Sequence, residues 1–137
     1  MTTINATKGE FVNLINGLFR VQEMKGKEFS LAVSKNITAI RKELKEVEEA
    51  GIPSPEFLKL AEEVNTLANE NSEDSKKKID QLEIENKELV ETRKAQVEEI
   101  KEMLQNNTSI ELELVSTEIL PEDITAKQIN SIEIIIK

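Results

Sequence analysis

The sequence predicts a mainly α-helical protein, in which an antiparallel helical hairpin or small bundle carries a minor β element. Two stretches, 75–106 and 30–50, place apolar residues three and four positions apart, which puts them on one face of a helix. Their other faces are charged, so each stripe needs a partner, and we expect the two stripes to pack against each other. Apolar residues alternate with Glu over 110–114, which is typical of a half-buried strand.

Two helices are predicted in the first third of the chain. Thr7 and Glu10 form a capping-box pattern, and the helix that follows has an apolar face and ends before Gly26. The next helix covers 30–50 and ends at Gly51, a residue suited to a helix C-terminus, with Pro53 blocking its continuation. The apolar positions of the two helices are Phe11, Leu14, Ile15, Leu18 and Val21, and Val33, Ile37, Ile40, Leu44 and Val47.

The middle of the chain predicts two more helices joined by a polar turn at 69–74. Ser54 followed by Pro55 is a helix start, and the long helix then covers 75–106. Asn86 and Arg93 interrupt its apolar stripe, and two interpretations stay open. Either they set register and reach water, as in coiled coils, or they form a polar pocket between helices. The stripe consists of Ile79, Leu82, Leu89, Val97, Ile100 and Leu104.

The C-terminal part predicts a strand over 110–117, interrupted by Pro121, and a short helix that Thr125 and Gln128 cap. Residues 134–136, which are three Ile, form either a strand or the end of that helix. The N-terminus is a further candidate strand. We expect one domain over 1–137, with basic helices in 1–50, a helical arm in 54–106 and a strand and short helix in 110–137.

Composition argues against most catalytic chemistry. The chain has no Cys and no His, which removes the thiol nucleophile and the commonest general base and metal ligand. We therefore expect no enzyme activity, catalytic residue, metal site or cofactor. No apolar run approaches the ~20 residues of a membrane span. The net charge of −9 argues against general nucleic-acid binding.

Positive charge is concentrated at the N-terminal end. Residues 1–45 hold eight Lys and Arg against four Glu, whereas 46–137 hold ten against 23 acids. One interpretation is a site for phosphates or an acidic protein, and the other is an ordinary mixed surface. The candidate ligand-binding residues are Arg20, Lys25, Lys27, Lys35, Arg41 and Lys42.

The chain resembles a family of small uncharacterised proteins of bacteriophages and prophages of Gram-positive bacteria. The resemblance rests on KGEFVNLINGLF (8–19), SLAVSKNITAIRKELKEVEEA (30–50), EIKEMLQNNTSIELELVSTEI (99–119) and LPEDITAKQINSIEIIIK (120–137). It covers both ends of the chain, whereas 51–95 is longer and more helical here. It implies a phage origin and no enzymatic activity, and it transfers no binding residues.

Two functional hypotheses follow. The first is a non-enzymatic phage accessory protein that acts by binding in the host cytoplasm. It would counter host defence by sequestering a small anionic signal such as a nucleotide, or by blocking a defence protein. The alternative is a structural or assembly component of the virion. In both we expect a homo-oligomer, because the stripes at 33–47 and 79–104 exceed what one small chain covers, and the strand at 110–115 offers an edge for pairing.

Overall fold

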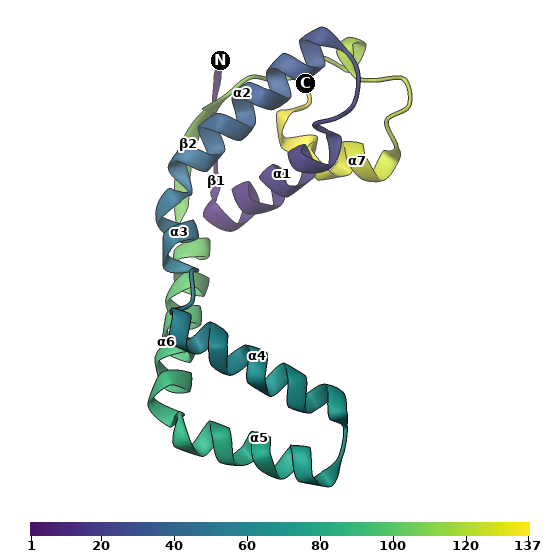
Figure 1. Ribbon diagram of the computed structural model, residues 1–137. Coiled ribbons are helices and arrows are strands. Elements are labelled where there is room, and N and C mark those ends of the chain that lie inside the picture. The colour runs from purple at the N-terminus through teal and green to yellow at the C-terminus, as the bar shows by residue number, and fades with distance from the viewer. The chain divides into compact units, whose positions relative to one another are not determined.

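The computed structural model describes all 137 residues and confirms the predicted fold class: a mainly helical protein with a small antiparallel sheet (Figure 1). Helices α4 and α5 form the helical hairpin. Seven α-helices, two strands and two short 3-10 helices follow the order β1 Thr2–Thr7, α1 Lys8–Val21, α2 Lys27–Glu43, α3 Lys45–Ala50, α4 Pro55–Glu70, α5 Glu73–Glu85, α6 Lys87–Gln105, β2 Asn107–Leu112, η1 Thr117–Ile119, α7 Ala126–Ser131 and η2 Glu133–Ile135. None of the helices combines the length and apolar content that crossing a bilayer requires.

Contacts between residues group the chain into two compact units. Unit 1 comprises Met1–Glu48 and Glu102–Lys137, and unit 2 comprises Glu49–Lys101. The two ends of the sequence therefore build unit 1 together, and the middle of the chain builds unit 2. That residues 1–137 form one domain stays a prediction.

The sheet of unit 1 pairs the two ends of the chain. β1 and β2 are antiparallel in a continuous register from Thr2 opposite Leu112 to Thr7 opposite Asn107. The N-terminal strand was a candidate, and it is confirmed. β2 begins at Asn107, three residues earlier than predicted. It ends at Leu112, because the backbone of Glu113 bonds to the side chain of Asn36 on α2.

The residues 134–136 do not form a regular strand. Glu133–Ile135 is a 3-10 turn, and Ile136 then makes an isolated parallel bridge to Val115. Val115 donates its N–H to the carbonyl of Ile135 at 2.7 Å and accepts from the N–H of Lys137 at 3.0 Å. These bonds place Ile135 in the core beside Val115, both fully buried.

Local helix signals in the sequence act as predicted. Thr7 Oγ1 accepts from the N–H of Glu10 at 3.1 Å, and the Glu10 carboxylate accepts from the N–H of Thr7 at 3.4 Å. The second predicted box, at Thr125 and Gln128, is also present. Ser54 caps α4, with Pro55 as its first residue. The predicted apolar face of α1 is buried throughout, at Phe11, Leu14, Ile15, Leu18 and Val21.

The predicted helix over 30–50 is divided at Leu44 into α2 and α3. The packing partner predicted for its apolar stripe was also wrong. α2 packs on α1 and β2 in unit 1, whereas α5 packs on α4 in unit 2. The short connector between α1 and α2 makes these helices neighbours, and their apolar faces share one core with β2 and the C-terminal turn. That core includes Phe29, Val33 and Ile40.

The predicted helix over 75–106 is divided in two at Asn86. The Nδ2 of Asn86 donates to the carbonyl of Leu82 at 2.9 Å, and its backbone leaves helical geometry at φ −111° and ψ 27°. A short amide side chain that bonds to the preceding turn competes with the regular helix. Asn86 therefore marks a break between α5 and α6 and not a position in one continuous seam.

Arg93 does not simply extend into water. Its Nη1 donates to the Gly51 carbonyl at 3.2 Å and to Gln96 Oε1 at 2.8 Å, and its guanidinium lies 5.8 Å from the centre of the Phe57 ring. Gln96 Nε2 donates to the carbonyls of Ala50 and Ile52 at 2.5 and 3.1 Å. Asn86 bonds within its own helix, so the two residues do not share one polar pocket, and only Arg93 makes a polar contact between segments. It satisfies carbonyls at the C-terminal end of α3.

Asn36 is the one fully buried polar side chain in the core of unit 1. Its Nδ2 donates to the Glu113 carbonyl at 2.9 Å, and its Oδ1 accepts from the Glu113 N–H at 2.8 Å. The Asn36 side chain thus bonds to the backbone of Glu113, the residue after β2, as a neighbouring strand would. Both backbone groups of Glu113 are satisfied although no strand lies beside them.

Replacing Asn36 with Leu should lower the free energy of unfolding by about 2–3 kcal/mol, because both backbone groups of Glu113 lose their hydrogen-bond partner and face an apolar side chain instead. Asn36→Asp should also lower it, because one carboxylate oxygen then meets the Glu113 carbonyl oxygen and the charge is buried. Urea denaturation measures both. Asn65→Leu, on the exposed face of α4, is the control and should change stability by less than about 0.5 kcal/mol. An equal loss in the two Leu variants would contradict the assignment.

Candidate functional site

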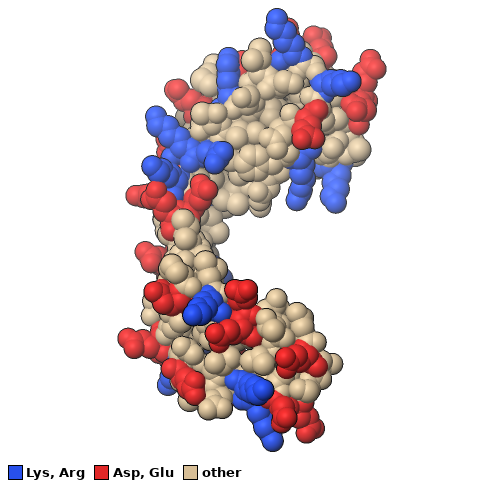
Figure 2. Space-filling model, viewed as in Figure 1, with Lys and Arg blue, Asp and Glu red and all other residues tan.

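The six candidate cationic residues all lie in unit 1, and all are exposed. Arg20 is near the end of α1, Lys25 is in the connector, and the other four are on α2. In Figure 2, Lys and Arg side chains appear over this unit as separate groups interleaved with Asp and Glu. The structure therefore does not gather the six residues into one pocket.

The four cations of α2 form a stripe along the helix. At 100° per residue, Lys27, Lys35, Arg41 and Lys42 fall within about 120° of each other, on the side opposite the buried face. Lys27 and Lys42 are 15 positions apart, or about 22 Å along the axis. That separation exceeds the reach of one small anion and suits an elongated partner.

Lys35 is the one candidate that has an ion-pair partner. Its Nζ lies 3.5 Å from Glu113 Oε2, and the two side chains are 59% and 40% exposed. An exposed pair of this kind contributes between about 0 and 1 kcal/mol. Glu113 is also the residue whose backbone Asn36 holds, so α2 contacts it with two side chains one position apart.

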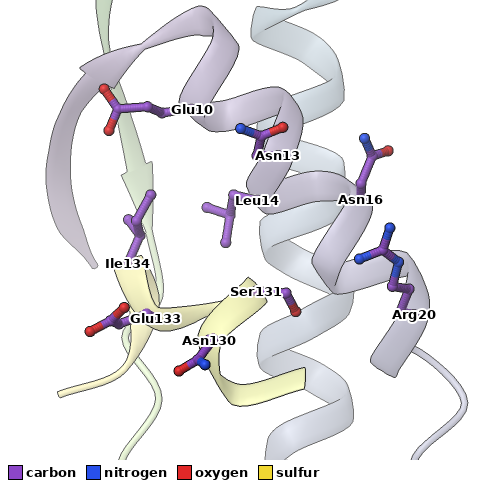
Figure 3. Close-up of a pocket in the computed structure, with 9 residues that line it drawn as sticks. All are labelled: Glu10, Asn13, Leu14, Asn16, Arg20, Asn130, Ser131, Glu133 and Ile134. Atoms are coloured by element: carbon purple, nitrogen blue, oxygen red, sulfur yellow. The ribbon is translucent and has the colours of Figure 1, made fainter. Parts of the chain in front are cut away.

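Arg20 lines a groove of about 370 Å³ between α1 and the C-terminal turn (Figure 3). Leu14, Ser131 and Ile134 lie at the middle of this groove, with Glu10 and Arg20 toward opposite ends. Arg20 is its only cation, and two carboxylates, Glu10 and Glu133, line it as well. The groove residues are Glu10, Asn13, Leu14, Asn16, Arg20, Asn130, Ser131, Glu133 and Ile134.

The chemistry of the groove does not favour a polyanion. Two carboxylates against one guanidinium give it a net negative formal charge, which repels a nucleotide. No group of three or more His, Cys, Asp and Glu side chains is arranged to hold a metal ion. What the groove offers is hydrogen bonding from the carboxamides of Asn13, Asn16 and Asn130.

Beside the groove, α1 and α7 approach closely at Gly17 and Ser131. A Cβ at this position would lie 2.6 Å from the backbone oxygen of Ser131 and 2.9 Å from its Cβ. Only the hydrogen of glycine fits there, so Gly17 sets the separation of the two helices. Sequence analysis did not single out Gly17, because a glycine inside an amphipathic pattern gives no sign of what packs on it.

Asn36 was also missed, although a signal was available. Phe29, Val33, Asn36, Ile40 and Leu44 recur in steps of four, three, four and four, so position 36 lies on the buried stripe of α2. A polar residue at such a position predicts a buried hydrogen bond. The groove residues Asn13, Asn16 and Asn130 carry no comparable signal, since they are exposed on their helices.

No family model, curated protein or solved structure matches the chain.

Gly17→Ala should destabilise the protein by about 1–3 kcal/mol although alanine favours helix formation, because the new methyl group meets backbone and α7 has to move. Thermal and urea unfolding measure the loss. Asn16→Ala, one position earlier and exposed, should leave stability unchanged or slightly raised. A Gly17→Ala variant as stable as the wild type would show that α7 does not pack this closely.

Proposed function

We propose that the protein is a non-enzymatic phage accessory protein that acts by binding another protein through unit 2. In the host cytoplasm, the partner is a host defence protein that this contact blocks. The phage origin is supported by the sequence resemblance, and the mode of action by the surface of the helical hairpin.

The proposal that unit 2 binds a protein rests on how few of its apolar side chains are buried. Leu60 is its only buried apolar side chain, and the residues of α6 are at most half-buried. Ile52, Leu58 and Ile84 are 62%, 52% and 76% exposed. Leu58 and Ile84 are on the paired helices α4 and α5, and Ile52 is in the loop before α4. Exposed apolar side chains favour a protein contact, because covering them releases water.

A virion or assembly component is the alternative that the same surface supports. In that case the partner is a structural protein of the particle, and the protein is located in the virion and not free in the host. Purified particles distinguish the two: a fixed copy number per particle supports the virion role, and absence from particles supports the host partner.

Sequestration of a small anion by the N-terminal cations is a further proposal. Five of the six candidates, Arg20, Lys25, Lys27, Arg41 and Lys42, have no ion-pair partner. The three of them on α2 are spread along the helix, which favours a long acidic surface over a nucleotide, so we rank this proposal below protein binding.

A photo-crosslinking amino acid at Leu58 or Ile84 should form an adduct of one discrete mass when the protein is produced during phage infection. The same group at Glu63, on another side of α4, should form none. Adduct masses in a denaturing gel and peptide identification provide the measurement. Equal adducts at all three positions, or adducts with copies of the chain alone, would contradict binding through this surface.

Linear and cyclic nucleotides should leave the melting temperature of the purified protein unchanged. A ligand at ~100 times its dissociation constant adds about 2.7 kcal/mol to the native state, which such a scan detects easily. A shift with one nucleotide class, removed by Arg41→Glu or Lys35→Glu, would instead establish sequestration at the cation stripe. A shift that both variants retain would place the ligand elsewhere.

A further inference from the structure

We propose that the outer edge of β1 pairs with the same edge of a second copy, which joins the two sheets into one antiparallel four-stranded sheet. The two-fold axis passes beside Ile4. The inference goes beyond the proposed function by assigning the surface through which the expected homo-oligomer forms. It is independent of the unit 2 surface, because β1 belongs to unit 1.

The outer edge of β1 is open. The N–H of Lys8 donates to the carbonyl of Asn106, which continues the register of the sheet. In an antiparallel ladder, alternate residues turn their backbone groups toward the partner, so the groups of even-numbered residues face β2. Those of Thr3 and Asn5 face away, and no group in the chain bonds to them. The N–H of Thr7 bonds to Glu10.

β1 has none of the features that protect an exposed strand. Its six residues, TTINAT, include no charge, no Pro and no Gly, and its register has no bulge. Natural edge strands are normally shielded by such features against pairing with another chain. β2 differs, because α2 contacts it and Asn36 occupies the backbone of the next residue.

The occupant that this edge fits is a second copy of the chain. Each copy carries a net charge of −9, so association is least opposed where both surfaces are uncharged, as they are along β1. Antiparallel pairing about Ile4 places Thr3 opposite the partner's Asn5, and Asn5 opposite the partner's Thr3. The outward N–H and C=O groups of these residues then make four hydrogen bonds across the axis.

Burial on the inner face of the sheet supports the same register. Ala6, Ile110 and Leu112 share this face with Ile4 and are at most 9% exposed, whereas Ile4 is only half-buried. The pairing places Ile4 beside the partner's Ile4 as a non-hydrogen-bonded pair, the closer type of cross-strand pair. The side chain of Ile4, which is half-buried at the open edge, is thereby buried against the partner's Ile4.

Sedimentation equilibrium of the full chain tests the proposal with two matched double variants at exposed positions. T3K/N5K places like charges opposite each other across the axis, whereas T3K/N5E places opposite charges there. The wild type should have a mass of twice 15.5 kDa. T3K/N5K should shift toward 15.5 kDa, with a dissociation constant raised at least about tenfold, and T3K/N5E should remain a dimer. Circular dichroism should show all three proteins folded.

Three results would overturn the proposal. These are a wild type that stays at 15.5 kDa at every concentration, a dimer that T3K/N5K leaves unchanged, and a T3K/N5E variant that dissociates as readily as T3K/N5K. Crosslinking from Leu58 and Ile84, repeated in T3K/N5K, separates this interface from the proposed function. If T3K/N5K still forms the adducts but no longer forms the dimer, partner binding and self-association use different surfaces.

Discussion

The paired hydrogen bonds between the Asn36 side chain and the backbone of Glu113 are the contact on which the fold of unit 1 depends. An amide side chain presents one donor and one acceptor, as a strand does, so a helix satisfies the backbone of a sheet edge. The contact lets α2 lie on β2 without leaving polar groups unpaired. It also ends the ladder and directs the chain to Val115, whose bridge to Ile136 brings the C-terminal turn into the core.

The two units differ in how completely they bury their apolar residues. In unit 1 the faces of α1 and α2, the sheet and the C-terminal turn enclose a continuous core whose largest members are fully buried. In unit 2 most apolar side chains on α4, α5 and α6 stay half-buried or exposed, and Arg93 and Gln96 bond to the carbonyls of 50–52. This difference in burial is the observation from which we propose binding through unit 2.

The arrangement of charge limits what the basic N-terminal region can bind. A pocket for a small anion needs cations that converge within a few ångströms, and α2 instead spreads its cations along its length. The groove beside Arg20 has carboxylates at its margin. The spread of the cations follows from their position on the solvent face of α2, where successive side chains are separated by the helical rise. An elongated acidic surface matches this spacing, whereas a nucleotide does not.

The amino-acid sequence by itself determined the class of the fold, the starts of α1, α4 and α7 and the inner face of the strand. Capping at Thr7, Ser54 and Thr125 and the alternation from Ile110 depend on residues a few positions apart, and such short-range physics can be read directly. The turn predicted at 69–74 is shorter in the structure and consists of residues 71 and 72, because Ser72 and Ser75 cap α5. Only the tertiary structure decided which apolar stripes meet, because any two stripes of similar width are complementary in sequence. It likewise decided the partner of Asn36, the close approach at Gly17, the carbonyls that Arg93 contacts and the dispersal of the cations. Each of these depends on the positions of groups far apart in the chain, which spacing along the sequence does not encode.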